Sequence, residues 1–597
     1  MSRPIAKEPE YPFRDNTKSI DERVSDLLSR MTLAEKAGQL FHNMLVPGPG
    51  GSLAPEIPSF SIEDTRSLLT KKYMTHFNLL GPVEDPVMIA KWHNAVQECA
   101  LSTRLGIPVT FSTDPRHHFT ENVGTAFSAG TMSQWPETLG FAALRDEALV
   151  ERFANIARQE YLALGLRTSL HPQVDLATEY RWARINTTFG EDAELSGKLA
   201  QAYIRGFQGP GFSHTSVSTM TKHFPGGGPQ KDGEDAHFVY GREQYYPGKQ
   251  EAYHLKPFEM AIAAGTRQIM PYYGMPVGTE WEEVGFAFNK GVITGILREE
   301  LGFEGIIVTD WGLITDSSIM GQDMPARAWG CENLSELQRV KNILDAGCDQ
   351  FGGESRPELV IQLVQDGLIP ESRIDESVRR ILREKFLLGL FEQPFIDPNA
   401  ALIVGNPAWK AEGEAAQRRA HTLLKNDNNI LPLQDLKGKR VYVEGISKDA
   451  ANARGLIVVP PDQAEIAILR LRCPYEPRSG GFEAHFHAGS LAFSAEERAR
   501  QAEIFSKVDV SIVDMYLDRP AVIPELASQV TALTGSYGSS EDAFLDVISG
   551  AASPEGSLPF DLPSSMEAVQ ESREDVPFDT TRPLFKFGHG LRYTSST

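Results

Sequence analysis

Residues 291–311 read GVITGILREELGFEGIIVTDW, and this stretch decides the fold class. Its first part, Val292 to Glu300, has the apolar spacing of an amphipathic helix, and Gly302 follows where a left-handed helix cap favours glycine. A short apolar run, Gly305 to Thr309, then ends at the carboxylate of Asp310. The order helix, glycine, buried strand and polar residue is typical of an α/β protein with a parallel sheet.

The same unit recurs from about residue 20 to residue 395. The further apolar runs are Ile107 to Phe111, Ser216 to Met220 and Gln268 to Met270, and the further helical patterns are Asp146 to Leu164, Ala193 to Phe207 and Ile374 to Leu388. Repeated strand and helix units over this length predict a TIM-like (β/α)8 barrel at residues 1–395.

A second domain is predicted after a break in the pattern. Prolines and a loss of helical periodicity indicate a linker at residues 396–414. Residues 415–597 then carry apolar runs at Arg440 to Glu444, Leu456 to Pro460, Glu465 to Leu471 and Val508 to Met515, and helical patterns at Ala495 to Phe505, Glu525 to Leu533 and Asp542 to Ile548. We therefore expect an α/β sandwich, an open sheet covered by helices, after the barrel.

The composition excludes several classes of protein. The 597 residues are 41% hydrophobic and 23% charged, with 51 Gly and 38 Pro, which excludes disordered and collagen-like chains. Acidic residues outnumber basic ones by 80 to 58, and the formal charge of −22 would repel nucleic acid and anionic membranes. The polar N-terminus lacks the apolar run of a signal peptide, and no stretch reaches the roughly 18 apolar residues that span a bilayer, which predicts a cytoplasmic protein.

Polar residues follow the apolar runs at their carboxyl ends. They are Asp114 after IPVTF, Lys222 and His223 after SVSTM, Tyr272 and Tyr273 after QIMP, and Asp310 after GIIVT. Any one of them could be a solvated loop residue. Because active sites of barrels are built at the carboxyl ends of the strands, their recurrence favours one shared polar pocket.

Two segments carry chemistry. TKHFPGGG at residues 221–228 lets the backbone approach a ligand, but it forms neither G-x-x-x-x-G-K-[ST] nor G-x-G-x-x-G, so a phosphate loop is not favoured. In FEGIIVTDW a strand delivers Asp310 beside Trp311. The simpler interpretation of Asp310 is a helix N-cap. The alternative is a carboxylate that attacks a sugar's anomeric carbon while the indole stacks on C–H groups.

These motifs together resemble glycoside hydrolase family 3, whose members are retaining, exo-acting β-glycosidases that pair a barrel with an α/β sandwich. The resemblance covers nearly the whole chain. The motifs, in the family's order, are RVSDLLSRMTLAEKAGQL (23–40), IPVTFSTD (107–114), VDLATEYRWARI (174–185) to FGEDAEL (189–195), TKHFPGGG (221–228), residues 291–311, SPEGSLPFDLP (553–563) and LFKFGHGLRYT (584–594). The family often adds a fibronectin-like domain after the last motif, and we expect none here.

The resemblance implies roles for single residues. Asp310 is similar to the nucleophile, Trp311 to the indole that lines the −1 subsite, Tyr273 to the tyrosine that hydrogen-bonds the nucleophile, and Asp114, Arg184, Lys222 and His223 to the residues that hold sugar hydroxyls. The residue types agree, because a carboxylate accepts from two adjacent hydroxyls while Lys and Arg donate and keep a nucleophilic carboxylate ionised. One departure is Ala183, where the family usually has glycine.

The general acid/base is less well defined. In many members it is a glutamate two residues after a Pro-Tyr pair, on a loop of the second domain. Residues 473–493 resemble that loop, but the expected position holds Pro477, with Glu476 one residue before it and Glu483 six residues after it. Either glutamate is a candidate, and at least one must be an ordinary surface carboxylate.

The resemblance implies an exo-acting retaining β-glucosidase that releases terminal non-reducing β-D-glucosyl residues through a covalent glycosyl-enzyme. It implies a small β-glycoside or oligosaccharide substrate and no metal or organic cofactor; a homo-oligomer stays open. One alternative is a β-xylosidase. Another is a β-N-acetylglucosaminidase, since that branch uses an Asp-His pair, which Asp235-Ala236-His237 partly imitates. A non-catalytic sugar-binding protein is disfavoured, because it would need no nucleophile.

Overall fold

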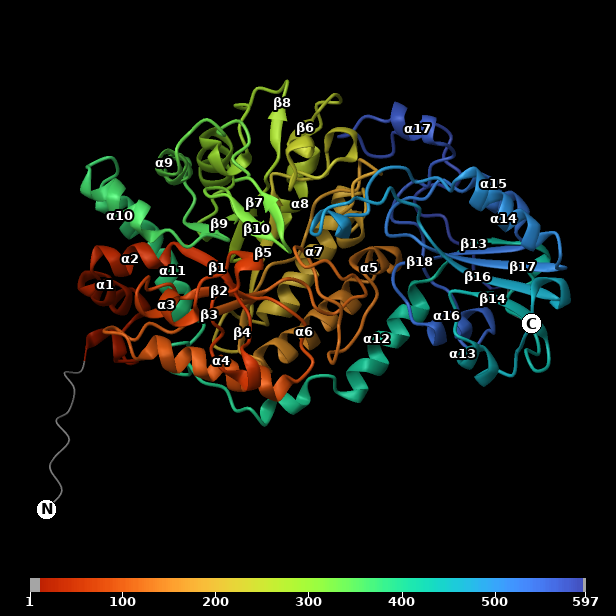
Figure 1. Ribbon diagram of the computed structural model, residues 1–597, viewed down its shortest axis with the longest axis horizontal. Coiled ribbons are helices and arrows are strands. Elements are labelled where there is room, and N and C mark those ends of the chain that lie inside the picture. The colour runs from red at the N-terminus through yellow and green to blue at the C-terminus, as the bar shows by residue number, and fades with distance from the viewer. Residues whose placement is uncertain (1–10, 594–597) are drawn as a thin grey trace, which may run out of the picture.

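The computed structural model describes residues 11–593, in which a closed barrel is followed by a second sheet (Figure 1). Residues 1–10, on which the expectation of no signal peptide rests, and Thr594, at the end of the LFKFGHGLRYT motif, lie outside the described residues. The predicted fold class, a TIM-like barrel followed by an α/β sandwich, is confirmed.

Eight parallel strands close the barrel, and they neighbour one another in chain order. They are β1 (Phe41–Leu45), β2 (His76–Leu79), β3 (Thr110–Thr113), β4 (Leu166–Ser169), β5 (Ser218–Phe224), β7 (Gln268–Pro271), β9 (Ile306–Trp311) and β12 (Gln350–Gly352). All but two of their residues are buried, as expected for parallel strands enclosed by helices. Two small ribbons, β6 (Glu243–Tyr245) with β8 (Met275–Val277) and β10 (Ser317–Ile319) with β11 (Gln322–Met324), project from the strand ends.

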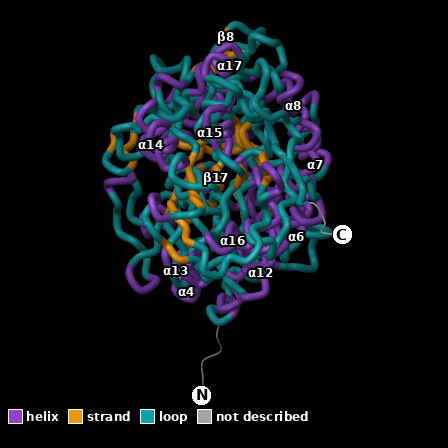
Figure 2. Tube along the Cα trace, turned by 90° about the vertical axis from the view of Figure 1, so that its right-hand side faces the viewer, coloured by secondary structure: helices purple, strands orange, loops and turns teal. Residues whose placement is uncertain are grey.

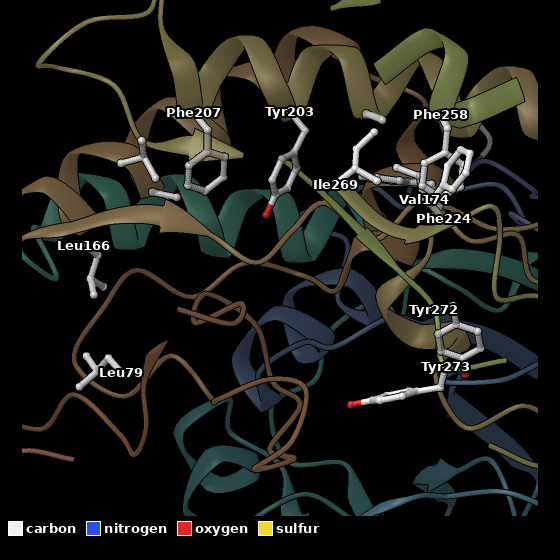
Figure 3. Close-up of a cluster of buried hydrophobic side chains, with 14 of the residues drawn as sticks. Leu79, Leu166, Val174, Tyr203, Phe207, Phe224, Phe258, Ile269, Tyr272 and Tyr273 are labelled. Carbon is white, nitrogen blue, oxygen red and sulfur yellow. The ribbon is translucent and has the colours of Figure 1, made fainter. Parts of the chain in front are cut away.

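Helices surround the barrel: α1 (Ile20–Arg30), α2 (Leu33–Gln39), α3 (Thr65–Thr70), α4 (Pro86–Leu101), α5 (Thr138–Leu144), α6 (Glu147–Ala163), α7 (Ala193–Gln208), α8 (Glu251–Ala263), α9 (Glu336–Ala346), α10 (Pro357–Gln365) and α11 (Glu371–Leu387). The predicted helix at 292–300 is a wider π-helix over Gly291–Glu300. Aromatic packing joins helix to strand, as at Phe258 of α8, which meets Phe224 of β5 edge to face at 5.3 Å (Figure 3).

The second domain has a six-stranded sheet in the order β13-β18-β17-β16-β14-β15, with only β13 antiparallel to its neighbour within the described chain. The strands are β13 (Thr422–Asn426), β14 (Arg440–Glu444), β15 (Ile457–Val458), β16 (Ile466–Arg472), β17 (Val510–Tyr516) and β18 (Ala532–Ser536). Both views show α14 (Ala495–Phe505) and α15 (Pro524–Gln529) on one side of this sheet and α13 (Lys448–Ala453) and α16 (Glu541–Ile548) on the other (Figures 1 and 2).

The helix predicted at Glu525 to Leu533 is wrong at its end. It stops at Gln529, and Ala532–Ser536 form β18 between β13 and β17, because these small and apolar residues fill the centre of the sheet. The segment predicted as a linker, 396–414, includes the start of α12 (Pro407–Ala420).

The domains are joined by more than the linker. α12 packs against both α5 of the barrel and α16. The C-terminal segment, with α17 (Met566–Glu571), returns to the barrel, where Asp575 accepts hydrogen bonds from the backbone N–H groups of Gly248 and Gln250 (both 2.8 Å). Among residues 11–593, no helix is long and apolar enough to cross a membrane.

Candidate active site

A pocket of about 610 Å³, part of it open to solvent, lies at the carboxyl ends of the barrel strands, within the usual size of small-molecule sites. Seven residues predicted from the sequence to form the site line it together: Asp114, Arg184, Lys222, His223, Tyr273, Asp310 and Trp311. The second domain closes it with Phe482. Among the pocket-lining residues of the described chain, His237 is present, whereas Glu476 and Glu483 are not.

Asp310 is the penultimate residue of β9, and only 6% of it is exposed. Its Oδ1 accepts a hydrogen bond from the backbone N–H of Trp311 at 2.9 Å. Its Oδ2 has no hydrogen-bond partner among residues 11–593, and it lies 3.8 Å from Nε2 of His223. One carboxylate oxygen is thus held by the backbone while the other is available to a ligand.

His223 is held as a neutral ring. Its Nδ1 donates to Asp175 Oδ2 at 2.7 Å, and its Nε2 accepts from Arg184 Nη1 at 3.1 Å. Burial, and then the charge of Arg184, lower the pKa of His223 well below its ordinary value, in agreement with this proton arrangement. Arg184 also donates from Nη2 to Gln173 Oε1 at 3.1 Å. The ring of His223 and the guanidinium of Arg184 are therefore fixed as one unit.

Lys222 and Asp114 form a buried ion pair beside this unit. Lys222 Nζ lies 3.1 Å from Asp114 Oδ1, and Asn78 Nδ2 donates to Asp114 Oδ2 at 3.0 Å. Burial lowers the pKa of Lys222, and the charge of Asp114 opposes that effect. Both side chains carry further hydrogen-bonding capacity toward the pocket, which suits a ligand with adjacent hydroxyl groups.

Hydrogen bonds to its backbone and close packing around its ring fix the position of Trp311. The Tyr273 hydroxyl donates to Trp311 O (3.0 Å) and accepts from Trp311 N (2.9 Å), so Tyr273 and Asp310 share the Trp311 amide as a hydrogen-bonding partner. Burial, and then the charge of Asp310, raise the pKa of Tyr273, which keeps its hydroxyl protonated. A Cβ built on Gly353 would lie 2.6 Å from the indole, so only glycine fits there without a shift.

Asp235 and His237 form a second buried pair in the pocket wall. His237 Nδ1 donates to Asp235 Oδ1 at 2.6 Å, and Trp182 Nε1 donates to Asp235 Oδ2 at 2.9 Å. The His237 ring meets Tyr273 edge to face at 4.7 Å and Phe486 at 5.0 Å. Burial lowers the pKa of His237, while the Asp235 carboxylate opposes that effect and so favours the protonated ring.

The two candidate glutamates lie on the second domain's loop but outside the pocket. Glu476 is exposed, and its carboxylate lies over Gly489. Glu483 accepts a hydrogen bond from the Tyr240 hydroxyl. The same loop is anchored to the barrel through Asn122 Nδ2, which donates to His485 O at 3.1 Å. The acid/base role of either glutamate stays a prediction.

Several buried polar atoms around the pocket have no hydrogen-bond partner among residues 11–593. They are Asp310 Oδ2, Arg184 Nε, Trp311 Nε1, Arg327 Nε and Asn78 Oδ1. Because native proteins satisfy most buried polar groups with protein, water or ligand partners, these atoms are available to a ligand that brings donors and acceptors of its own.

Sequence reasoning missed four residues of the site: Asn78, Asp175, Arg327 and Phe482. Asn78 lies in β2, and Asp175 follows β4 in the chain. The sequences of these strands, HFNL and LRTS, lack an apolar run. Asp175 does fall within the quoted stretch VDLATEY, so its place after a strand was the available signal. Arg327 and Phe482 reach the pocket only through tertiary contacts.

Comparison with known proteins identifies the family. The family model described as "Glycosyl hydrolase family 3 N terminal domain" matches residues 32–384. "Beta-glucosidase C" of Emericella nidulans is 58% identical over 585 residues, which cover 97% of this chain and 94% of that protein. "Periplasmic beta-glucosidase/beta-xylosidase" of Dickeya chrysanthemi is 39% identical over 601 residues, with 97% and 91% covered.

A solved structure supports the fold. The crystal structure of a beta-glucosidase from Listeria innocua in complex with isofagomine has a TM-score of 0.75 and 20% identity, and covers 96% of this chain and 83% of that chain. The family model spans more than half of the chain, and the relatives span nearly all of it. The resemblance seen in the sequence is therefore confirmed: the chain belongs to glycosyl hydrolase family 3 and is a glycoside hydrolase.

Proposed function

We propose that this glycoside hydrolase is an exo-acting, retaining β-glucosidase. The observation that carries the proposal is Asp310, a buried carboxylate that lines a pocket of hydroxyl-binding groups and whose Oδ2 has no hydrogen-bond partner among the described residues. The names of the Emericella and Dickeya relatives add glucose as the sugar. The pocket is lined on one side by the second domain, which suits the capture of a chain end.

In this mechanism Asp310 Oδ2 forms a bond to the anomeric carbon as the bond to the leaving oxygen breaks. A general acid gives its proton to the leaving oxygen; the same group then takes a proton from the water that releases the sugar. The Lys222–Asp114 pair and the Arg184–His223 unit hold the sugar hydroxyls during both steps.

For the acid/base, the geometry supports His237 best. It lines the pocket, and its Nδ1 is occupied by Asp235, so Nε2 is the nitrogen that can exchange a proton with the substrate. The Asp235 carboxylate stabilises the imidazolium that this role requires. Glu476 and Glu483 would need the loop at 473–493 to move before either reached the sugar.

The same pair favours a second candidate function, β-N-acetylglucosaminidase, since an Asp-His pair is the arrangement expected for that branch. β-Xylosidase is a third candidate, because the Dickeya relative carries both names. Glucose and xylose differ by one hydroxymethyl group. Burial of its methylene alone changes specificity by about 10- to 200-fold, and a hydrogen bond to its hydroxyl raises that ratio further.

One assay separates these functions. We expect the p-nitrophenyl β-glucoside to have the highest kcat/KM, the β-xyloside to be lower by at least about 10-fold, and the N-acetyl-β-glucosaminide to be lower still. A higher kcat/KM on the N-acetyl-β-glucosaminide would overturn the proposal. Asp345→Asn, an exposed carboxylate on α9, serves as the control for Asp310→Asn, which should abolish turnover.

A further inference from the structure

The entrance of the pocket differs in chemistry from its floor. The floor carries charged groups that are almost fully buried, such as Lys222 (4% exposed) and Asp310 (6%). The entrance carries four apolar side chains, each from a different connection beyond the strand ends. They are Phe60 between β1 and β2, Val123 after β3, Ile319 in β10 and Phe482 of the second domain. We call these four residues the apolar wall.

The apolar wall is built into the packing between the domains. The Phe482 ring lies on Gly124, where an added Cβ would be 2.6 Å from it, and it meets Phe486 edge to face at 5.2 Å. Gln322 of β11 accepts from the backbone N–H of Phe482 at 3.0 Å, which ties the second domain's loop to the ribbon that carries Ile319. Phe482 is buried, whereas Phe60, Val123 and Ile319 are partly buried and keep some surface that a substrate could cover.

Of the polar groups that line a neighbouring cavity beside this wall, Ser61, Asp316 and Glu354 already make hydrogen bonds within the protein, whereas Arg327 Nε has no partner among residues 11–593. Ser61 Oγ accepts from Ser318 N at 2.9 Å, and Asp316 Oδ1 accepts from Ala326 N at 2.8 Å. Glu354 accepts from two backbone N–H groups and a hydroxyl of the loop after β9. These groups hold the loops in place, so they offer little to the hydroxyls of a second sugar.

We propose that the apolar wall is the aglycone subsite, and that it selects β-glucosides with an alkyl or aryl aglycone over those with a second sugar. The inference rests on the proposed β-glucosidase function and deepens it. With the glucosyl unit on the charged floor, the leaving group must point toward the entrance. A second sugar finds no hydrogen-bond partner on the four side chains of the wall, whereas an alkyl chain gains from each methylene it buries there.

The test is kcat/KM along a series of n-alkyl β-glucosides from methyl to octyl. Their leaving alcohols have similar acidity, so the chemical step changes little along the series. We expect kcat/KM to rise by up to about fourfold for each methylene buried, and hexyl β-glucoside to exceed cellobiose. Ile319→Ser and Phe482→Ser should each flatten the series, and Ile319→Ser leaves the core of the loop intact. Leu402→Ser, at a residue 73% exposed in the connection before α12, should leave the slope unchanged.

A flat series in the natural chain, or cellobiose ahead of hexyl β-glucoside, would overturn the subsite while leaving the β-glucosidase function standing. A slope that survives both Ile319→Ser and Phe482→Ser would overturn the assignment to the apolar wall. Absence of turnover on every β-glucoside, methyl included, would refute the proposed function and the subsite with it.

Discussion

Asp175→Asn tests how the sugar-binding groups are held. Asp175 is fully buried, and its Oδ1 accepts the backbone N–H groups of His223 (3.1 Å) and Gly227 while Oδ2 accepts Nδ1–H of His223 (2.7 Å). An asparagine that keeps its oxygen on the two backbone donors must turn its NH₂ toward Nδ1. The proton of His223 then moves to Nε2, where it faces the N–H of Arg184 at 3.1 Å.

The size of the effect follows from these contacts. Hydrogen bonds to a charged group contribute about 1.5–3 kcal/mol, and the substitution loses one and sets two donors against each other. If that loss falls on the bound sugar through His223 and Arg184, kcat/KM should fall about 10- to 150-fold. The fold should survive, because asparagine keeps the shape and the two backbone hydrogen bonds.

The assay is kcat/KM on p-nitrophenyl β-glucoside, together with the thermal unfolding midpoint. Asp192→Asn is the matched control, since Asp192 caps α7 through Leu195 N outside the pocket. Asparagine caps a helix about as well as aspartate, so we expect kcat/KM and the midpoint to stay close to those of the unchanged enzyme. A kcat/KM for Asp175→Asn within about threefold of the unchanged enzyme, with an unchanged midpoint, would refute the view that Asp175 sets the orientation of His223.

Three further predictions concern the acid/base and the indole. His237→Ala should slow turnover of a substrate with a poor leaving group by about 10²- to 10⁴-fold, and azide should restore turnover with β-glucosyl azide as the product. Glu476→Ala should show neither effect. Azide rescue of Glu476→Ala alone would assign the acid/base role to Glu476 on the second domain's loop. Because His237 must be protonated and burial lowers its pKa, kcat/KM should fall as pH rises through a value below 6.5. Asp235→Asn removes the carboxylate that stabilises the protonated ring, so the loss of kcat/KM should occur at a lower pH. An unchanged pH profile would contradict the pairing of Asp235 with His237. Gly353→Ala should raise KM by displacing the Trp311 indole, since the added methyl would lie 2.6 Å from the ring at a φ of +69°; an unchanged KM would show that the indole does not contact the sugar.

The sequence predicts the fold where apolar runs are continuous. The strand at Arg440–Glu444 and the helix at Ala495–Phe505, which was predicted from its helical spacing, have the same bounds in the structure as in the prediction. β1 and β2 were not predicted, because they contain the polar residues His42 and His76. Tertiary contacts stabilise these residues inside the barrel, such as the hydrogen bond between His42 Nε2 and Ser112 Oγ at 2.7 Å. A single-sequence pattern cannot tell such a strand from a loop.

Some residues of the candidate site could be predicted from the sequence and others could not. Strand-end residues such as Lys222 and Asp310 could be predicted, because a parallel barrel brings all strand ends to one rim. Phe482 could not, because its place depends on how a loop of the second domain crosses the barrel. For the acid/base, spacing favoured Glu476, whereas the pocket is lined by His237 and by neither glutamate.

If Asp310 is the nucleophile of a retaining reaction, a slow substrate should leave its sugar covalently bound to Asp310. Covalent trapping is the direct test. The enzyme is incubated with 2-deoxy-2-fluoro-β-D-glucosyl fluoride, digested and analysed by peptide mass mapping. We expect one fluoroglucosyl group per chain, on the carboxylate of Asp310 within GIIVTDW. A label on any other carboxylate would contradict it, as would inactivation that leaves no covalent sugar on the chain.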